Sequence, residues 1–250
     1  MTTRAPAPGP APAIVTGASR SIGRAIAERL ARDGHPVVVN YSRDAGGADE
    51  TVQSIVAAGG RAIATRGDVA SPTDVEELFA TARTEFGAVG ILVNNAGVSV
   101  LGELSELDDN AYDRVFDVST RGTYNGVRSA ARHLADGGRI VNLSSTAVAV
   151  TTPRMGVYLA AKAAVETFTR VAAKELASRG ITVNAVAPGL VRSEMFADGK
   201  TPEQLAAIEK ASPAGRLGGV TEIADAVALL TSSEASWISG QIVRVNGGVA

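Results

Sequence analysis

Residues 13–27 read AIVTGASRSIGRAIA, a short apolar run followed by a turn of small residues and the start of a helical pattern. Gly17 permits a tight turn out of the apolar run, and Gly23 lies one turn into the helix, where a missing Cβ allows close approach. Free N–H groups at the start of such a helix favour a pyrophosphate. The stretch therefore predicts a strand–loop–helix unit that binds a dinucleotide. The alternative is an ordinary strand–turn–helix in which the glycines serve only packing.

The loop departs from the standard dinucleotide pattern G-x-G-x-x-G. Its spacing is T-G-x-x-x-x-x-G, and Ser21 stands where a middle glycine is often found. Serine is small enough to fill that place, although its backbone is less free than that of glycine.

Short apolar runs and helical stretches alternate along the rest of the chain. Apolar strands separated by single helices indicate a parallel sheet covered on both faces, and right-handed crossovers favour a doubly wound topology. We therefore predict a single α/β domain over residues 13–250, a seven-stranded parallel sheet with helices on both faces that binds its ligand at the carboxyl ends of the strands. Strands are expected at residues 13–16, 36–40, 61–66, 91–94, 138–144, 182–187 and 241–245. Helices are expected at residues 21–33, 47–58, 72–86, 108–134, 156–179 and 221–230.

The composition excludes several classes of protein. The 250 residues include no Cys and only two His, which rules out disulfide frameworks, thiolate metal sites and Cys nucleophiles and argues against a His-based metal site. Lys and Arg total 24 against 26 Asp and Glu, so the basic excess of a nucleic-acid binder is missing. No apolar run reaches the roughly 18 residues of a membrane span. The lack of Cys favours a reducing compartment, and we expect a cytoplasmic protein.

The first twelve residues differ from the rest. They read MTTRAPAPGPAP and contain four Pro. Alternating Pro and Ala favours an extended, solvated segment, and Pro interrupts the apolar stretch that a signal peptide needs. We expect a disordered leader over residues 1–12, with a weak transit function as the alternative.

The end of the second expected strand indicates which nicotinamide cofactor the loop would bind. An NAD enzyme usually has Asp or Glu there, to accept from the ribose 2′-hydroxyl. Residues 37–43 read VVVNYSR, so Asn40 is neutral and Arg43 follows it closely. Arg20 and Arg43 offer guanidinium groups that grip a 2′-phosphate with charge-assisted hydrogen bonds. We therefore predict NADPH/NADP as the cofactor, and two solvated surface arginines are the alternative.

Tyr158 and Lys162 form a second candidate site. They are four residues apart on an expected helix, so the phenol and the ammonium group share one face. A nearby cation favours the phenolate and lowers the pKa of a tyrosine from about 10, which makes it a usable acid–base near neutral pH. The alternative is an amphipathic helix in which the tyrosine packs and the lysine extends to solvent. Ser145 follows the preceding strand, so its hydroxyl is expected at the same end of the sheet as this pair.

Together these motifs resemble the short-chain dehydrogenase/reductase family, most closely its branch of 3-oxoacyl-[acyl-carrier-protein] reductases. The resemblance implies a Rossmann-type fold and hydride transfer from a nicotinamide to a carbonyl carbon. It also implies that Tyr158 gives the proton, that Ser145 orients the oxygen, and that Lys162 holds the ribose and lowers the pKa of Tyr158. The similarity runs through almost the whole chain after the leader and rests on TGASRxIGRAIA in the first loop, NNAG at 94–97, the 13-residue spacing from Ser145 to Tyr158, YxxxK at 158–162 and PGxVxS at 188–193.

The resemblance also assigns the cofactor contacts. The Asp68 side chain and the Val69 backbone would hold the adenine, and Ser193 replaces a Thr whose hydroxyl clasps the nicotinamide amide. The alternative for Asp68 is that it only caps the next helix. The predicted cofactor-binding residues are Gly17, Ser19, Arg20, Ser21, Ile22, Gly23, Asn40, Tyr41, Ser42, Arg43, Asp68, Val69, Asn95, Ala96, Gly97, Tyr158, Lys162, Pro188, Gly189, Val191 and Ser193.

One position departs from the family pattern. The family has an Asn in the long fourth helix that helps to bind a proton-relay water, and this chain has Ser119 there. Serine is shorter and both donates and accepts hydrogen bonds. Ser119 therefore joins Ser145, Tyr158 and Lys162 as a candidate catalytic residue, with a merely helical role as the alternative.

The substrate is less specified. The resemblance favours a 3-oxoacyl thioester on acyl carrier protein, an acidic partner that needs basic docking residues. Relatives tend to have a basic cluster before the GRI strand, where this chain has Asp136. A general carbonyl reductase or alcohol dehydrogenase for small or hydrophobic ketones is therefore the alternative, and an NADP(H)-binding protein with little turnover is a rival from another class. We expect no nucleic-acid or membrane partner.

A lid and self-association are also expected. Residues 195–213 would cover the substrate and contain a short helix near 202–210. The long helices at 108–134 and 156–179 exceed what one sheet face needs to bury, and in the family these faces pair between subunits. The C-terminal stretch at 237–248 resembles a second interface, so we predict a homotetramer.

Overall fold

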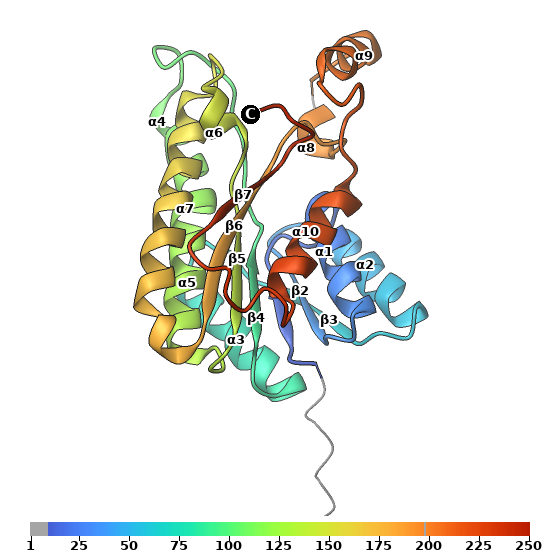
Figure 1. The fold of residues 1–250 in the computed structure, drawn as a ribbon, viewed down its shortest axis with the longest axis vertical. Coiled ribbons are helices and arrows are strands. Elements are labelled where there is room, and N and C mark those ends of the chain that lie inside the picture. The colour runs from blue at the N-terminus through green and yellow to red at the C-terminus, as the bar shows by residue number, and fades with distance from the viewer. Residues whose placement is uncertain (1–9, 198) are drawn as a thin grey trace, which may run out of the picture.

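Seven parallel strands form one sheet in the order β3-β2-β1-β4-β5-β6-β7. The computed structural model describes residues 10–197 and 199–250, and Figure 1 shows the sheet between two layers of helices. The predicted Rossmann-type, doubly wound sheet is confirmed, and each strand ends within one residue of its expected bounds. The strands are β1 (Ala13–Val15), β2 (Val37–Tyr41), β3 (Ala62–Arg66), β4 (Ile91–Asn94), β5 (Arg139–Leu143), β6 (Thr182–Pro188) and β7 (Ile242–Val245).

Helices cover both faces of this sheet. Strand β4 is apolar over its first three residues because Ile91 and Val93 face one layer and Leu92 faces the other. Full burial of one such side chain contributes roughly 1.5–3 kcal/mol. The first layer comprises α1 (Ser21–Arg32), α2 (Ala45–Ala57) and α10 (Val220–Thr231), and the second comprises α3 (Pro72–Phe86), α5 (Gly122–His133) and α7 (Gly156–Glu175).

One expected helix is interrupted. The stretch at residues 108–134 consists of α4 (Asp109–Val115), a π-helical turn η1 (Phe116–Arg121) and α5. A π turn adds a residue to the helical repeat, which the apolar spacing of the flanking turns does not reveal. The expected helix at 156–179 is α7 followed by a 3-10 turn, η2 (Ala177–Arg179).

Three short helices follow the carboxyl ends of β5 and β6. They are α6 (Ala147–Val150), α8 (Glu194–Ala197) and α9 (Pro202–Ala211). Helix α9 confirms the short helix expected within the lid, and a capping box between Thr201 and Gln204 starts it.

The last residues of the expected leader contact the domain. The carbonyl oxygen of Pro12 accepts hydrogen bonds from the N–H groups of Gly90 and Ile91 at 3.0 and 3.1 Å. The carbonyl oxygen of Ala11 lies 2.7 Å from Nδ1 of His35. Residues 11 and 12 of the expected leader are thus held by hydrogen bonds, and residues 1–9 lie outside the described residues.

The described part of the chain has no helix long and apolar enough to cross a membrane. It also has no group of three or more His, Cys, Asp or Glu side chains placed to hold a metal ion. Its candidate chemical groups lie where the parallel strands end, at one edge of the sheet.

Candidate active site

One asparagine fixes the first loop to the end of β4. The side-chain amide of Asn95 donates to the carbonyl oxygens of Thr16 (2.8 Å) and Gly17 (3.0 Å). The Thr16 hydroxyl accepts from the main-chain N–H groups of Asn95 and Ala96, each at 3.0 Å. These bonds join the ends of β1 and β4. They hold the first loop against the turn at Ala96 and Gly97, and we call this joined surface the floor of the site.

The loop glycines meet steric demands that a side chain would violate. Gly17 has φ +60°, and a Cβ there would lie 3.0 Å from Cα of Ala96. A Cβ on Gly23 would lie 2.2 Å from the carbonyl oxygen of Gly17 and 2.5 Å from Nδ2 of Asn95. Ser21 has φ +52°, in the left-handed region that costs a non-glycine residue about 1–2 kcal/mol. The loop therefore keeps its tight shape with a strained serine in the place of a glycine.

The other loop residues point in different directions. Ser19 is buried, and its carbonyl oxygen accepts from the Thr51 hydroxyl of α2 at 3.3 Å. Ile22 packs against the apolar core between the sheet and the first layer of helices. Arg20, expected at the 2′-phosphate, pairs instead with Glu194 of α8 across 3.3 Å. The pair connects the loop with the expected lid.

Asn40 anchors two loops. It is buried at the end of β2, where its Oδ1 accepts from the N–H of Gly17 at 3.3 Å and its Nδ2 donates to the carbonyl oxygen of Gly67 at 2.9 Å. Both ends of the Asn40 amide therefore bond to the protein and support the site, and its contact with the cofactor stays a prediction. Tyr41 packs against the apolar core between the sheet and the first layer of helices, and its carbonyl oxygen accepts from the N–H of Gly67 at 2.9 Å.

A hollow of about 350 Å³ opens at the ends of β2 and β3. Three predicted cofactor residues, Ser42, Arg43 and Asp68, line it together with Arg66. The Asp68 carboxylate accepts from the N–H of Ala70 at 2.9 Å in the turn before α3, whereas the N-cap of α3 is Ser71, so Asp68 does not cap this helix. Asp74 and Glu77 of α3 complete the lining.

Val69 lies against the fourth helical stretch. A Cβ on Gly122 would come within 2.6 Å of the Val69 Cγ2 atom. The carbonyl oxygen of Val69 accepts from Nδ2 of Asn125 at 2.9 Å. The loop after β3 is thereby held against α5, which leaves Asp68 exposed.

Ser119 and Lys162 meet at one glycine. A Cβ on Gly97 would lie 3.2 Å from Nζ of Lys162 and 3.5 Å from Oγ of Ser119. Ser119 lies in the π turn and is fully buried, and its hydroxyl lies between the N–H and the carbonyl oxygen of Val98 at 3.4 and 3.5 Å. The carbonyl oxygen of Ser119 accepts from the Thr123 hydroxyl at 2.8 Å. The structure thus brings Ser119 and Lys162 to the same glycine, and a catalytic role for Ser119 stays a prediction.

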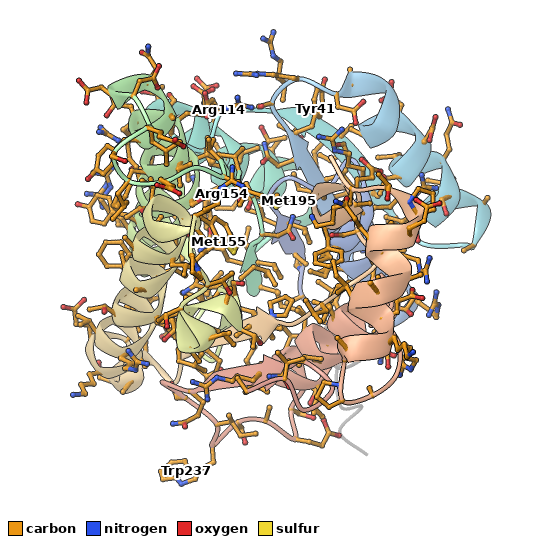
Figure 2. All side chains as sticks on the ribbon, turned by 90° about the horizontal axis from the view of Figure 1, so that it is seen from above. Tyr41, Arg114, Arg154, Met155, Met195 and Trp237 are labelled. Atoms are coloured by element: carbon orange, nitrogen blue, oxygen red, sulfur yellow. The ribbon has the colours of Figure 1, made fainter. Side chains whose placement is uncertain are left out.

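Ser145, Tyr158 and Lys162 also come together. Ser145 follows β5, and its hydroxyl accepts from the N–H of Ala147 at 3.2 Å. Nζ of Lys162 is buried, lies 5.9 Å from the centre of the Tyr158 ring and donates to the carbonyl oxygen of Leu143 at 2.7 Å. Figure 2 looks down on this end of the molecule, with Arg154 and Met155 beside α7 and Met195 across from them.

The pKa values depart from the expectation for this pair. Burial raises the pKa of Tyr158 above its ordinary value, and a hydrogen bond with the Ser145 side chain opposes that rise. Burial also lowers the pKa of Lys162 to about 8. The predicted lowering of the Tyr158 pKa is therefore absent, because desolvation of the phenolate outweighs the neighbouring groups.

The last predicted segment follows β6. A Cβ on Gly189 would lie 2.6 Å from Cα of Asn246, so the chain passes close to the end of β7 here. Pro188 ends β6, and Val191 is buried. The Ser193 hydroxyl, expected to clasp an amide, accepts from the N–H of Phe196 in α8 at 3.2 Å.

Buried hydrogen bonds behind the site were not predicted. The Ser144 hydroxyl donates to the Glu166 carboxylate at 2.9 Å, beside Ser145. Asn94 donates to Asn142 at 2.8 Å, and Asn142 donates to the Thr169 hydroxyl at 2.9 Å. The signal in the sequence was the presence of polar residues inside strands that are otherwise apolar, since a buried polar group needs a partner.

Known proteins resemble this chain over almost its whole length. A family model described as Enoyl-(Acyl carrier protein) reductase matches residues 17–250. The chain is 46% identical over 247 residues to a short-chain type dehydrogenase/reductase of Picea abies, covering 94% of this chain and 91% of the relative. It is 41% identical over 239 residues to a 3-oxoacyl-[acyl-carrier-protein] reductase of Staphylococcus aureus, covering 95% of this chain and 97% of the relative. A solved short chain dehydrogenase from Burkholderia cenocepacia in complex with NADP aligns with a TM-score of 0.89 at 38% identity, over 95% of this chain and 97% of that one.

Proposed function

The chain belongs to the short-chain dehydrogenase/reductase family, and from this we propose that it reduces a ketone to an alcohol with NADPH as the reductant. The observation that carries the proposal is the meeting of Ser145, Tyr158 and Lys162 at the strand ends that also hold the glycine loop. An acid, a hydrogen-bond donor and a cation thus surround one reaction position.

The residues present fit a nicotinamide dinucleotide phosphate. The first turn of α1 contains no acidic residue and has no side-chain cap, so its N–H groups are available to a phosphate. Gly17 and Gly23 let the loop pack tightly against Asn95 and Ala96, and at Gly97 the missing side chain leaves the space in front of Lys162 and Ser119 open. The NADP complex of the Burkholderia cenocepacia relative supports the same cofactor for this chain.

When bound, NADPH supplies the hydride that adds to the carbonyl carbon. Tyr158 donates its phenolic proton to the carbonyl oxygen as negative charge develops there. The Ser145 hydroxyl donates a hydrogen bond to the same oxygen and stabilises that charge. The Lys162 cation stabilises the phenolate that remains on Tyr158 until a proton returns from solvent. The product is an alcohol, and the enzyme regains its starting protonation state.

Two substrate classes are tested by one experiment. A 3-oxoacyl thioester comes first, because the Staphylococcus aureus relative is named for that substrate. A small or hydrophobic ketone without a carrier comes second. The Asp136 carboxylate supports this second class, because it is held by Arg179 at 2.7 Å where relatives tend to have basic docking residues.

NADPH consumption should be measured with an acetoacetyl thioester and with a plain diketone, using Tyr158→Phe as the matched variant. Turnover of the thioester that the variant loses supports 3-oxoacyl reduction. Turnover of the diketone alone moves the substrate to general ketones. NADPH binding without turnover of either compound contradicts the proposed reaction and favours the NADP(H)-binding alternative.

We also propose that the protein assembles as a homotetramer. Tyr124 of α5 and Val171 of α7 are exposed apolar residues on the two long helices, and Trp237 near β7 is 98% exposed. Light scattering on the purified protein gives the mass directly. A monomer at micromolar concentration contradicts the proposal.

A further inference from the structure

A buried carboxylate that the proposed reaction does not use lies behind the reacting groups. Glu166 belongs to α7, one turn after Lys162 and two turns after Tyr158, and its side chain is only 12% exposed. We propose that Glu166, through the hydroxyl group of Ser144, fixes the separation between Ser145 and Tyr158 and is thereby a positioning residue for ketone reduction. This inference rests on the proposed function and adds to it a residue that acts through its neighbours.

The two elements that hold the reacting groups are bonded to each other at successive residues. Leu143, the last residue of β5, accepts at its carbonyl oxygen from Nζ of Lys162 at 2.7 Å. The next residue, Ser144, donates through its hydroxyl group to Oε1 of Glu166 at 2.9 Å. Lys162 and Glu166 are four residues apart, so both contacts lie on one face of α7. Ser145 directly follows these two anchored residues.

The sheet holds the same strand end from its other side. The N–H groups of Ser144 and Thr146 donate to the carbonyl oxygens of Val186 (2.8 Å) and Pro188 (2.9 Å) in β6. These bonds place the main chain of Ser145 relative to the sheet. The distance from Ser145 to the phenol on α7 depends in addition on where α7 lies against β5. The contact between the hydroxyl and the carboxylate sets that position directly beside Ser145.

Both oxygens of the carboxylate have a partner. Oε1 accepts from Ser144, and Oε2 lies 3.2 Å from Nη2 of Arg170, which is half exposed one turn further along α7. A well-packed apolar side chain often stabilises a fold as well as a buried ion pair does. A carboxylate that accepts from one particular hydroxyl group also fixes a direction, because hydrogen bonds weaken steeply away from their preferred angle. These contacts therefore favour a role in positioning.

The same two elements offer a matched control. Nδ2 of Asn142 in β5 donates to the hydroxyl group of Thr169 in α7 at 2.9 Å, and both side chains are fully buried. Asn142 lies three residues before Ser145, so this bond joins β5 to α7 further from the reacting groups. Thr169→Val keeps the shape of the side chain and leaves a buried donor without its acceptor, as Glu166→Leu does for Ser144.

Three measurements on Glu166→Leu test the inference. Steady-state reduction of the better of the two substrates named above gives kcat, and fluorescence titration gives the Kd for NADPH. Crystal structures of the wild type and the variant give the distance between the Ser145 and Tyr158 hydroxyl groups without any turnover. We expect kcat to fall about tenfold or more, since small misplacements of reacting groups slow a reaction strongly. The Kd for NADPH should stay within about twofold, and the two hydroxyl groups should separate beyond about 3.5 Å.

Two further variants separate positioning from folding. Glu166→Gln still accepts from Ser144 at Oε1 and should keep kcat within about threefold of the wild type. Ser144→Ala should lose as much of kcat as Glu166→Leu does. The double variant should lose no more than either single variant, because the two residues act as one unit.

The control decides between a local and a general effect. Thr169→Val should lose stability in the same way and keep kcat within about twofold. An undiminished kcat in Glu166→Leu, an equal fall in Thr169→Val, or an unchanged contact between Ser145 and Tyr158 overturns the inference and leaves the proposed function intact. A wild type that reduces neither substrate overturns the proposed function, and the crystal structures then still decide whether Glu166 positions the two hydroxyl groups.

Discussion

The Lys162 ammonium group donates its hydrogen bond to the carbonyl oxygen of Leu143, 2.7 Å away. The same ammonium group lies 5.9 Å from the centre of the Tyr158 ring, so the cation is fixed by the end of β5 and acts on the phenol from a distance. Burial lowers the pKa of Lys162 to about 8, which shows that folding works against its charge. A charge kept under such conditions is typical of a functional group.

Replacing Lys162 with Met is expected to abolish reduction without destabilising the protein. Below pH 8 the lysine is protonated in both the folded and the unfolded protein. Because its pKa is lowered in the folded protein, keeping the charge there reduces the free energy of unfolding by about 3 kcal/mol. Methionine removes this cost, but it leaves the Leu143 carbonyl oxygen without a donor. The unsatisfied oxygen destabilises the folded protein by about 2 kcal/mol. Urea unfolding at neutral pH should therefore show a variant at least as stable as the wild type.

The difference in stability between the wild type and Lys162→Met should change with pH. From about pH 8 to 10.5 the unfolded lysine holds a proton that the folded one has lost, so the wild type gains stability relative to Lys162→Met as pH rises. Lys174→Met, which removes an exposed lysine, should show no such trend against the wild type. A constant difference between the wild type and Lys162→Met over this range contradicts the lowered pKa.

Ketone reduction should decline above about pH 8. There Lys162 loses the charge that stabilises the phenolate, while the raised pKa of Tyr158 keeps the phenol protonated. The value of kcat/KM is expected to fall about tenfold per pH unit beyond that point. Steady-state rates from about pH 6 to 10 check this, and a flat profile across the range speaks against a catalytic charge on Lys162.

Gly23→Ala should destabilise the protein by about 2 kcal/mol or more, in the range of overpacking. The added Cβ would lie 2.2 Å from the Gly17 carbonyl oxygen and 2.5 Å from Asn95, both of them parts of the floor. Gly46→Ala in α2 is the matched control, because nothing lies within 4 Å of its Cβ position. The control should raise the free energy of unfolding by about 0.5–1 kcal/mol. Equal effects of the two substitutions in urea unfolding would rule out the steric account.

Asn40→Asp should weaken both the fold and NADPH binding. The carboxylate has no N–H to donate to the Gly67 carbonyl oxygen, and its charge is buried, so we expect a loss of about 2 kcal/mol at neutral pH. Burial raises the pKa of such a carboxyl group above its unfolded value, so the loss should shrink as pH falls and the acid becomes a donor. Thermal unfolding from about pH 4 to 7 measures this, and a loss that is independent of pH contradicts the anchoring role.

The parts of the structure that follow a repeating pattern were predictable. The strands and the outer helices came from apolar spacing, because each buries a face against a neighbour whose position the topology fixes. Tyr158 and Lys162 were predictable for a similar reason, since helical spacing alone puts them on one face.

The parts that depend on a single contact were not predictable. Nothing in the spacing around Ser119 shows that the helix adds a residue there, because a π turn leaves the flanking turns unchanged. The use of both ends of the Asn40 amide depends on where Gly17 and Gly67 lie in space. Arg66 looked like an ordinary strand end until the register placed it beside the end of β2.

The strand order divides the site into two modules. Strands β1 to β3 lie on one side of the junction between β1 and β4, and Asn40, Arg43 and Arg66 lie at or near the ends of these strands. On the other side, the loop after β5 contributes Ser145, and α7 contributes Tyr158 and Lys162. On the proposed function, the adenosine end of the cofactor would therefore be recognised by a stretch of the chain separate from the one that contains the reacting groups. Protein engineers can exchange the first of these stretches for that of a relative with another cofactor preference while leaving the reacting groups in place, provided that the Asn95 contacts to Thr16 and Gly17 are preserved across the junction.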